Sequence, residues 1–190
     1  MPRLFLIRHA EPAASWGGAD IDPGLTEKGH WQAQETARAL LEFGDLALVS
    51  SPMLRCRQTA AAYAALRGRE AVIEQRVSEV VAPAGVMDRP AWLRANFPWD
   101  DGAPRRGWSD VDPVLRAWRD AAIGAMREIP RDAAVYSHFI AINAIVSAAM
   151  ESDETIVFRP GHASITELAH DGGKLSVVRL GADMTSSDVR

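Results

Sequence analysis

Three short, uninterrupted apolar runs constrain the fold of this chain more than any other feature. They lie at residues 4–7, 46–49 and 133–136. Continuous runs of this length are typical of strands that are buried on both faces of a parallel sheet. Segments with apolar residues at helical spacing follow them along the chain. The sequence therefore predicts an α/β fold, a three-layer α/β/α sandwich with a mostly parallel central sheet.

Capping and turn residues predict the remaining elements. Thr26 is a predicted helix N-cap, because apolar residues recur at helical spacing after it. Residues 71–73 form a short predicted strand, and the apolar spacing over 115–129 predicts an amphipathic helix. Residues 165–169 and 175–180 flank an Asp-Gly-Gly sequence, which predicts a hairpin that closes the sheet.

Composition and charge exclude several classes of protein. With 190 residues, 47% of them hydrophobic and 24% charged, the chain fits a single domain over 1–190. A net charge of −4 argues against nucleic acid and against anionic membranes as partners. No apolar stretch approaches the ~20 residues that a membrane span needs. The run at 4–7 leads straight into Arg8, so no secretory signal is expected.

The single cysteine bears on the cellular compartment. Cys56 cannot take part in an internal disulfide framework, which fits a reducing compartment and predicts a cytoplasmic protein. Its thiol is either a nucleophile or a small side chain that fills space in a helix, and we favour the second interpretation.

Residues 80–113 are predicted to form an irregular insertion folded over the sheet. The segment contains five prolines and three of the six tryptophans, which makes it too apolar for a disordered linker. One interpretation is a lid over the active site, in which aromatic residues stack on a ligand and arginines counter its charge. The favoured interpretation is that the tryptophans pack the insertion onto the domain and the arginines face solvent. These arginines are Arg89, Arg94, Arg105 and Arg106.

Polar side chains follow three of the predicted strands. Arg8 and His9 come after the first strand, Arg55 lies shortly after the second, and Ser137 and His138 follow the strand at 133–136. The carboxyl ends of parallel strands meet at one edge of a sheet, where ligands bind. Two arginines and two histidines at that edge would repel one another without an anion between them. Because guanidinium groups match phosphate oxygens, phosphate is the predicted anion.

Several motifs in order along the chain resemble those of the histidine phosphatase superfamily, which includes the cofactor-dependent phosphoglycerate mutases. The resemblance covers most of the chain. The motifs are Leu-Ile-Arg-His-Ala-Glu at 6–11, Leu-Thr-Glu-Lys-Gly at 25–29, Ser-Ser-Pro-Met-Leu-Arg-Cys-Arg-Gln-Thr-Ala at 50–60, Ser-His at 137–138 and Ala-Ser-Ile-Thr at 163–166.

The resemblance implies a role for each residue at the sheet edge. His9 matches the nucleophile that attacks phosphorus and carries the phosphoryl group. Arg8 and Arg55 match the arginines that bind the phosphoryl oxygens, and His138 matches a second histidine on the same group. Ser15 stands where many members carry an asparagine that contacts phosphate. For its nucleophilic nitrogen to be unprotonated, the other nitrogen of His9 should donate to a fixed acceptor, for which a backbone carbonyl is expected.

The proton donor is an acidic residue, and three glutamates are candidates. Glu79 occupies the place where the superfamily usually has its acid, with Glu74 as the nearest rival and Glu11 as a more distant one. A carboxyl that gives its proton to the leaving group needs a raised pKa. No cofactor is expected, and no metal either, since the histidines and the single cysteine form no recognisable ligand motif.

The chain departs from the superfamily pattern near the predicted site. Ala10 and Phe139 each stand where a glycine is usual or common, directly after His9 and His138. The other histidines are His30, His162 and His170, which we expect to be structural or exposed, although His162 lies in a Gly-containing loop that could approach the site.

The sequence thus predicts a phosphomonoester hydrolase that acts on a small phosphorylated metabolite or a phosphoprotein. Two alternatives stay open: a phosphoglycerate-type mutase, and an inactive phospho-ligand-binding module on the same scaffold. Exposed tryptophans would offer a contact for a homodimer.

Overall fold

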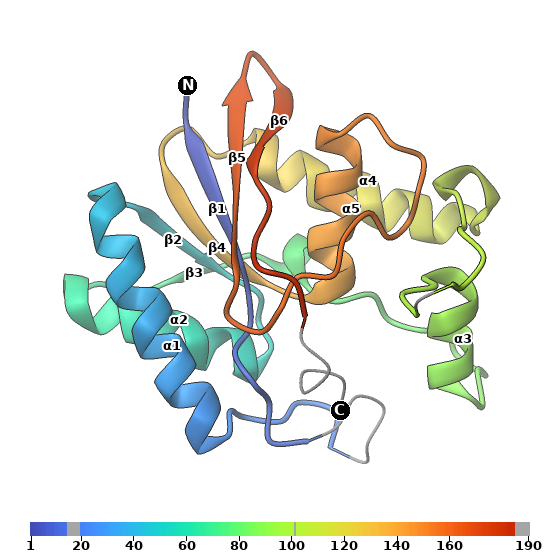
Figure 1. Ribbon diagram of the computed structural model, residues 1–190, viewed down its shortest axis with the longest axis horizontal. Coiled ribbons are helices and arrows are strands. Elements are labelled where there is room, and N and C mark those ends of the chain that lie inside the picture. Colours follow the sequence, from blue (N-terminus) through green and yellow to red (C-terminus); the bar gives the residue numbers. More distant parts are fainter. Residues whose placement is uncertain (15–19, 101, 185–190) are drawn as a thin grey trace.

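Six strands form one sheet in the part of the chain that the computed structural model describes, residues 1–14, 20–100 and 102–184 (Figure 1). Across the sheet the strands follow the order β3-β2-β4-β1-β5-β6. The strands are β1 (Arg3–Arg8), β2 (Ala47–Ser50), β3 (Val72–Ile73), β4 (Ala133–Ser137), β5 (Ile165–Asp171) and β6 (Lys174–Arg179). The helices are α1 (Glu27–Leu40), α2 (Leu54–Arg67), α3 (Arg89–Asn96), α4 (Pro113–Arg127) and α5 (Phe139–Ala149), with short 3₁₀ helices at Leu41–Phe43, Gln75–Val77 and Trp108–Asp110.

Four of these strands are parallel. β1 pairs with β4, β4 with β2, and β2 with β3 in parallel, whereas β5 pairs antiparallel with β1 and with β6. β5 and β6 are joined through Gly172 and Gly173, whose φ angles of 54° and 89° lie in the region that suits glycine in a tight hairpin turn. Both the mostly parallel sheet and the closing hairpin are confirmed.

Helices cover both faces of the sheet, which confirms the three layers (Figure 1). β1 shows the cause, because its side chains alternate between the faces. Leu4 and Leu6 pack with α4 and α5, whereas Phe5 and Ile7 pack with α1 and α2. α5 is mostly apolar but only 11 residues long, and none of the helices within the described residues is long and apolar enough to cross a membrane.

The start of α1 is anchored to the loop that follows β1. The hydroxyl of Thr26 accepts a hydrogen bond from the Gly29 amide at 2.9 Å, so the predicted N-cap is confirmed. Gly29 lies so close to the backbone of Glu11 that a Cβ on it would approach the Glu11 carbonyl oxygen to 2.3 Å. A glycine is therefore required where the helix meets this loop.

The insertion at 80–113 is more regular than the sequence suggests, and it contacts a different surface. It includes the eight-residue helix α3, with Asp88 as its N-cap and Pro90 in its first turn. Proline is tolerated at this position because the amides of the first turn have no intrahelical partner. The expectation of packing over the sheet is wrong: the buried residues of the insertion pack against α4 and α5, the helices that cover one sheet face.

The buried tryptophans agree with the packing interpretation of the insertion. Trp99 and Trp108 lie in a hydrophobic cluster with residues of α4 and α5. Two of the arginines form surface ion pairs, Arg94 with Asp100 and Arg105 with Glu154. A role for this segment as a lid over a bound ligand stays a prediction, as does a homodimer.

Replacing Trp108 with alanine is expected to lower the free energy of unfolding by about 3–5 kcal/mol. The side chain is 2% exposed, and its indole nitrogen donates to the hydroxyl of Ser147 at 3.0 Å. Urea denaturation would measure the change. The same substitution at Trp31, which is 61% exposed on α1, is the matched control and should change stability by less than about 0.5 kcal/mol. Equal losses in the two variants would contradict the assignment of Trp108 to the core.

Candidate active site

The register of the sheet places the ends of β1 and β4 next to each other. Arg8 pairs with Ser137 across the parallel ladder, so His9 and His138, one residue further along, leave the sheet side by side. Their ring centroids lie 5.4 Å apart. Arg55, in the first turn of α2, brings its Nη2 to 3.1 Å from Nδ1 of His138. The predicted convergence of these residues at one sheet edge is confirmed.

His9 is held in one tautomer. Its Nδ1 lies 2.9 Å from the carbonyl oxygen of Ala10. A carbonyl oxygen only accepts, so Nδ1 carries the proton and Nε2 keeps its lone pair. Burial lowers the pKa of His9 well below its usual value, and repulsion from His138 when that ring is protonated, from Arg55 and from Arg8 lowers it further. His9 is therefore uncharged at neutral pH and offers an unprotonated ring nitrogen, as a nucleophile requires.

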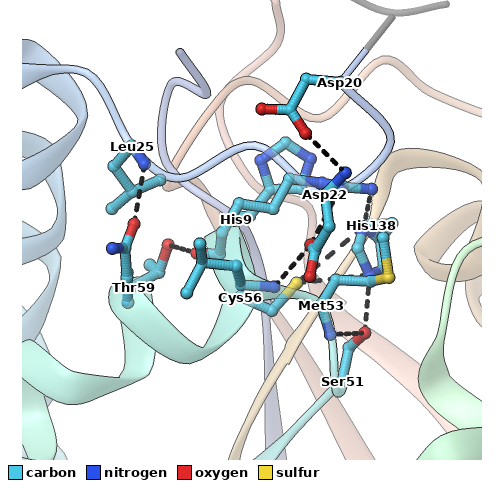
Figure 2. A network of polar contacts seen from close by, with 12 residues as sticks. His9, Asp20, Asp22, Leu25, Ser51, Met53, Cys56, Thr59 and His138 are labelled. Atoms are coloured by element: carbon cyan, nitrogen blue, oxygen red, sulfur yellow. Dashed lines mark hydrogen bonds and ion pairs between the residues drawn. The ribbon is translucent and has the colours of Figure 1, made fainter. Parts of the chain in front are cut away.

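His138 is completely buried and contacts partners through both ring nitrogens (Figure 2). The guanidinium of Arg55 can only donate, so Nδ1 of His138 accepts from it. The proton is then on Nε2, which lies 2.8 Å from the hydroxyl of Ser51 and 3.3 Å from Sγ of Cys56. Burial, followed by the charges of Arg55 and Arg8, holds the pKa of His138 well below its usual value. His138 is thus a second neutral imidazole in the site.

The two arginines are fixed by different parts of the chain. Nη1 of Arg8 donates to the carbonyl oxygen of Pro160 at 2.9 Å, and its guanidinium lies over the ring of Phe139, 5.3 Å from the centroid. Nη1 of Arg55 lies 3.9 Å from Oδ1 of Asp22, and the same oxygen accepts from the amide of Leu54 at the start of α2 at 2.7 Å. Asp22, in the loop after β1, therefore ties that loop to the helix that carries Arg55 (Figure 2).

Glu79 lies at the N-terminus of α5, the helix for which His138 is the N-cap residue. Its Oε2 accepts from the Ile140 amide at 3.1 Å, and its Oε1 accepts from the amides of Ala141 and Val80 at 3.2 and 3.1 Å. Burial raises the pKa of Glu79 above its usual value, against the effect of these hydrogen bonds and of the Arg55 charge. A raised pKa is the property that the proton donor needs.

The two rival glutamates are engaged elsewhere. Glu74 forms an ion pair with Arg76 at 2.8 Å, and this contact lowers the pKa of its carboxyl. Glu11 accepts from the hydroxyl of Thr26 at 3.0 Å and pairs with Lys28 at 2.9 Å, beside the start of α1. The ion pairs of Glu74 and Glu11 stabilise a carboxylate, whereas burial outweighs the hydrogen bonds of Glu79 and raises its pKa, so these observations favour Glu79 over its rivals.

These positions agree with the comparison to known protein families. The model of the histidine phosphatase superfamily (branch 1) matches residues 4–183. The chain belongs to the histidine phosphatase superfamily.

Relatives of known sequence or structure include several phosphatases. A probable phosphatase of Schizosaccharomyces pombe is 31% identical over 104 residues, which cover 50% of this chain and half the length of that curated relative. The mycobacterial glucosyl-3-phosphoglycerate phosphatase superposes with a TM-score of 0.73 at 20% identity, over 96% of this chain and 100% of that one. The phosphoserine phosphatase of Entamoeba histolytica, solved with phosphoserine, superposes with a TM-score of 0.69 at 20% identity, over 94% of this chain and 95% of that one. These structural likenesses establish the histidine phosphatase fold.

The structure shows how the two residues that depart from the superfamily pattern, Ala10 and Phe139, are accommodated. Ala10 has no left-handed backbone conformation, so alanine is accommodated there without strain. Phe139, in place of a glycine, provides the ring that stacks on Arg8 and in turn contacts Trp99 of the insertion, with ring centroids 6.5 Å apart. Phe139 thus connects Arg8 with the insertion.

One site histidine was not among the predicted site residues. The expectation that His162 is structural or exposed is incomplete, because its ring lies 5.7 Å from that of His9 and its Nε2 lies 2.9 Å from Nη2 of Arg8. The Gly-containing loop was the signal available in the sequence.

Ser15, the predicted phosphate contact, lies outside the described residues. Among the described residues, no group of three or more His, Cys, Asp or Glu side chains is arranged to hold a metal ion.

Cys56 is expected to resist thiol reagents in the native protein. It is fully buried, its Sγ donates to the Ser137 carbonyl oxygen at 3.4 Å, and burial raises its pKa to about 12. Because the thiolate is the reactive form, labelling with a chromogenic disulfide should be negligible until the protein is unfolded in guanidinium. Rapid stoichiometric labelling of the native protein would contradict the structural role of this thiol.

Proposed function

We propose that the protein is a phosphomonoester hydrolase that works through a phosphohistidine at His9, on a small phosphorylated metabolite or a phosphoprotein. The observation that carries the proposal is the state of His9. Its proton is held on Nδ1 by the Ala10 carbonyl, and its ring lies in a buried site with two guanidinium groups. An uncharged nucleophile among positive charges suits attack on an anionic phosphoryl group.

The reaction follows from the roles of four residues. Nε2 of His9 attacks phosphorus, and Arg8 and Arg55 stabilise the negative charge on the equatorial oxygens. As the bond between phosphorus and the ester oxygen breaks, Glu79 gives its proton to the departing alkoxide, which leaves as an alcohol. Glu79, now a carboxylate, takes a proton from water as the water oxygen attacks the phosphorus of phospho-His9. Phosphate leaves, His9 regains its lone pair, and Glu79 is protonated again.

The proposal also includes a role for His138 and a location in the cell. His138, which is neutral and hydrogen-bonded to Arg55, would contact the same phosphoryl group from its position beside His9. We also propose a cytoplasmic location, because the single cysteine suits a reducing compartment.

A substrate panel tests the proposal. Phosphate release would be measured with an aryl phosphate, phosphoserine, glucosyl-3-phosphoglycerate, a phosphopeptide and further phosphorylated metabolites, with and without a metal chelator. The expected result is hydrolysis that the chelator does not affect. Isomerised phosphoglycerate in the presence of a bisphosphorylated cofactor would support the mutase instead. Phosphate binding without turnover of any compound would support the inactive binding module.

A further inference from the structure

A third imidazole reaches the site from the loop between α5 and β5. The ring centroid of His162 lies 5.7 Å from that of His9, and its Nε2 lies 2.9 Å from Nη2 of Arg8. Because a guanidinium group only donates hydrogen bonds, Nε2 of His162 is the acceptor and its ring proton is on Nδ1. His162 therefore contacts Arg8 as a neutral acceptor.

The loop that carries His162 is fixed to the end of β1. The amide of Ala163 donates to the Arg8 carbonyl oxygen at 3.1 Å, and the amide of Arg8 donates to the Ser164 carbonyl oxygen at 3.3 Å. The hydroxyl of Thr36, on α1, donates to the Ala163 carbonyl oxygen at 2.8 Å. On its other side, the amide of Gly161 donates to the carbonyl oxygen of Ala182 at 2.8 Å. The backbone on both sides of His162 is thus held by other elements.

The backbone next to His162 is also strained. Ala163 has a φ of 56°, in the left-handed region that residues with a Cβ seldom adopt. Such a conformation persists where the surrounding structure enforces it, and it is frequent at functional sites. Here the hydrogen bonds of Ala163 to β1 and α1 enforce it, and the resulting turn directs the preceding residue, His162, toward Arg8.

Three of the contacts that Arg8 makes hold the plane of its guanidinium. Nη1 donates to the Pro160 carbonyl oxygen at 2.9 Å, Nη2 donates to His162, and Phe139 covers one face. The two acceptors come from the same short loop, and they are matched to the two ends of the guanidinium fork. A planar group that binds phosphoryl oxygens does so at a lower cost in conformational entropy when its plane is fixed before the substrate binds.

We propose that His162 is a positioning residue, which orients Arg8 for the phosphoryl group by accepting a hydrogen bond at Nε2. The role rests on the proposed function, in which Arg8 binds the transferred phosphoryl group. His162 itself need not touch the substrate. When His162 is lost, the guanidinium of Arg8 can rotate about the torsion angles of its long side chain. Part of the free energy of substrate binding is then used to order Arg8, so the substrate binds more weakly.

A set of three substitutions tests this role through the position of one acceptor atom. The amide oxygen of glutamine can occupy the place of Nε2, whereas that of the shorter asparagine can occupy only the place of Nδ1. We expect His162→Ala and His162→Asn to lower kcat/KM for an aryl phosphate by about 10- to 100-fold, the effect typical of a hydrogen bond to a charged group. His162→Gln should recover most of this loss. His30→Ala, on the exposed face of α1, is the control and should change nothing.

Oxyanion binding gives a second readout that does not depend on turnover. Titration calorimetry with tungstate should show weaker binding to the alanine and asparagine variants and near-normal binding to the glutamine variant. A purely structural role for His162 predicts lower thermal stability without this difference between glutamine and asparagine. That result, or wild-type kinetics and tungstate affinity in all three variants, would overturn the inference. If the wild type hydrolyses no phosphomonoester but tungstate binding follows the expected order, the proposed function fails and the role of His162 in orienting Arg8 stands.

Discussion

Replacing His9 with alanine is expected to reduce phosphate release by at least about 10³-fold, because the variant lacks the imidazole proposed to carry the phosphoryl intermediate. The loss should be similar for aryl and alkyl phosphates, since the nucleophile is needed whatever the leaving group. Initial rates of phosphate release under saturating substrate would measure it. Brief incubation of the wild type with a ³²P-labelled substrate, followed by rapid denaturation in base, should also trap an acid-labile label on His9.

The same variant should still bind oxyanions. Arg8, Arg55 and His138 remain in place around the site, so tungstate affinity should stay within a few-fold of the wild type. His30→Ala serves again as the control, because His30 is exposed on α1. Hydrolysis at the wild-type rate in His9→Ala would rule out a phosphohistidine at this position.

Replacing Glu79 with glutamine is expected to lower kcat/KM for alkyl phosphates by about 10²–10⁴-fold. Alkoxides are poor leaving groups and need a proton, which an amide cannot supply. Aryl phosphates leave as weakly basic phenolates, so kcat/KM for them, which reports transfer of the phosphoryl group to His9, should fall by less than about tenfold. The matched control is Glu74→Gln, where the carboxyl is paired with Arg76 at 2.8 Å and should have little effect on either substrate. Equal losses for alkyl and aryl phosphates would exclude Glu79 as the acid.

The pH dependence of the wild type should report the same group. Burial raises the pKa of Glu79, and the protonated form is the active one in the first step. Activity toward alkyl phosphates should therefore fall as the pH rises through this raised pKa. His9 has the opposite effect on the pH profile, because its neutral form is the active one. Since the pKa of His9 is lowered, protonation of this ring should reduce activity only at pH values well below the usual pKa of a histidine. An alkaline limb that persists unchanged in Glu79→Gln would assign the titration to another group.

Much of the architecture was readable from local patterns. The apolar run at 4–7 alternates between two packed faces, which is possible only in a strand covered on both sides, and the observed burial of Leu4 to Ile7 follows. The cap at Thr26 and the turn at Gly172 are local events, set by a side-chain oxygen and by the absence of a Cβ. The helix α3 in the insertion was harder to predict. Its start is marked by the N-cap Asp88 and a proline in the first turn, but the many prolines of the whole segment suggest irregular structure.

The sequence alone predicted that the two arginines and two histidines Arg8, His9, Arg55 and His138 meet at the sheet edge, because positions that follow parallel strands lie at the same edge. It did not determine the state of those residues. The lowered pKa of His9, the raised pKa of Glu79 and the contact of His162 with Arg8 arise from burial and from partners that are distant in the chain. Charge and proton position depend on the solvent exposure and the neighbours of each atom, and only the tertiary structure sets these.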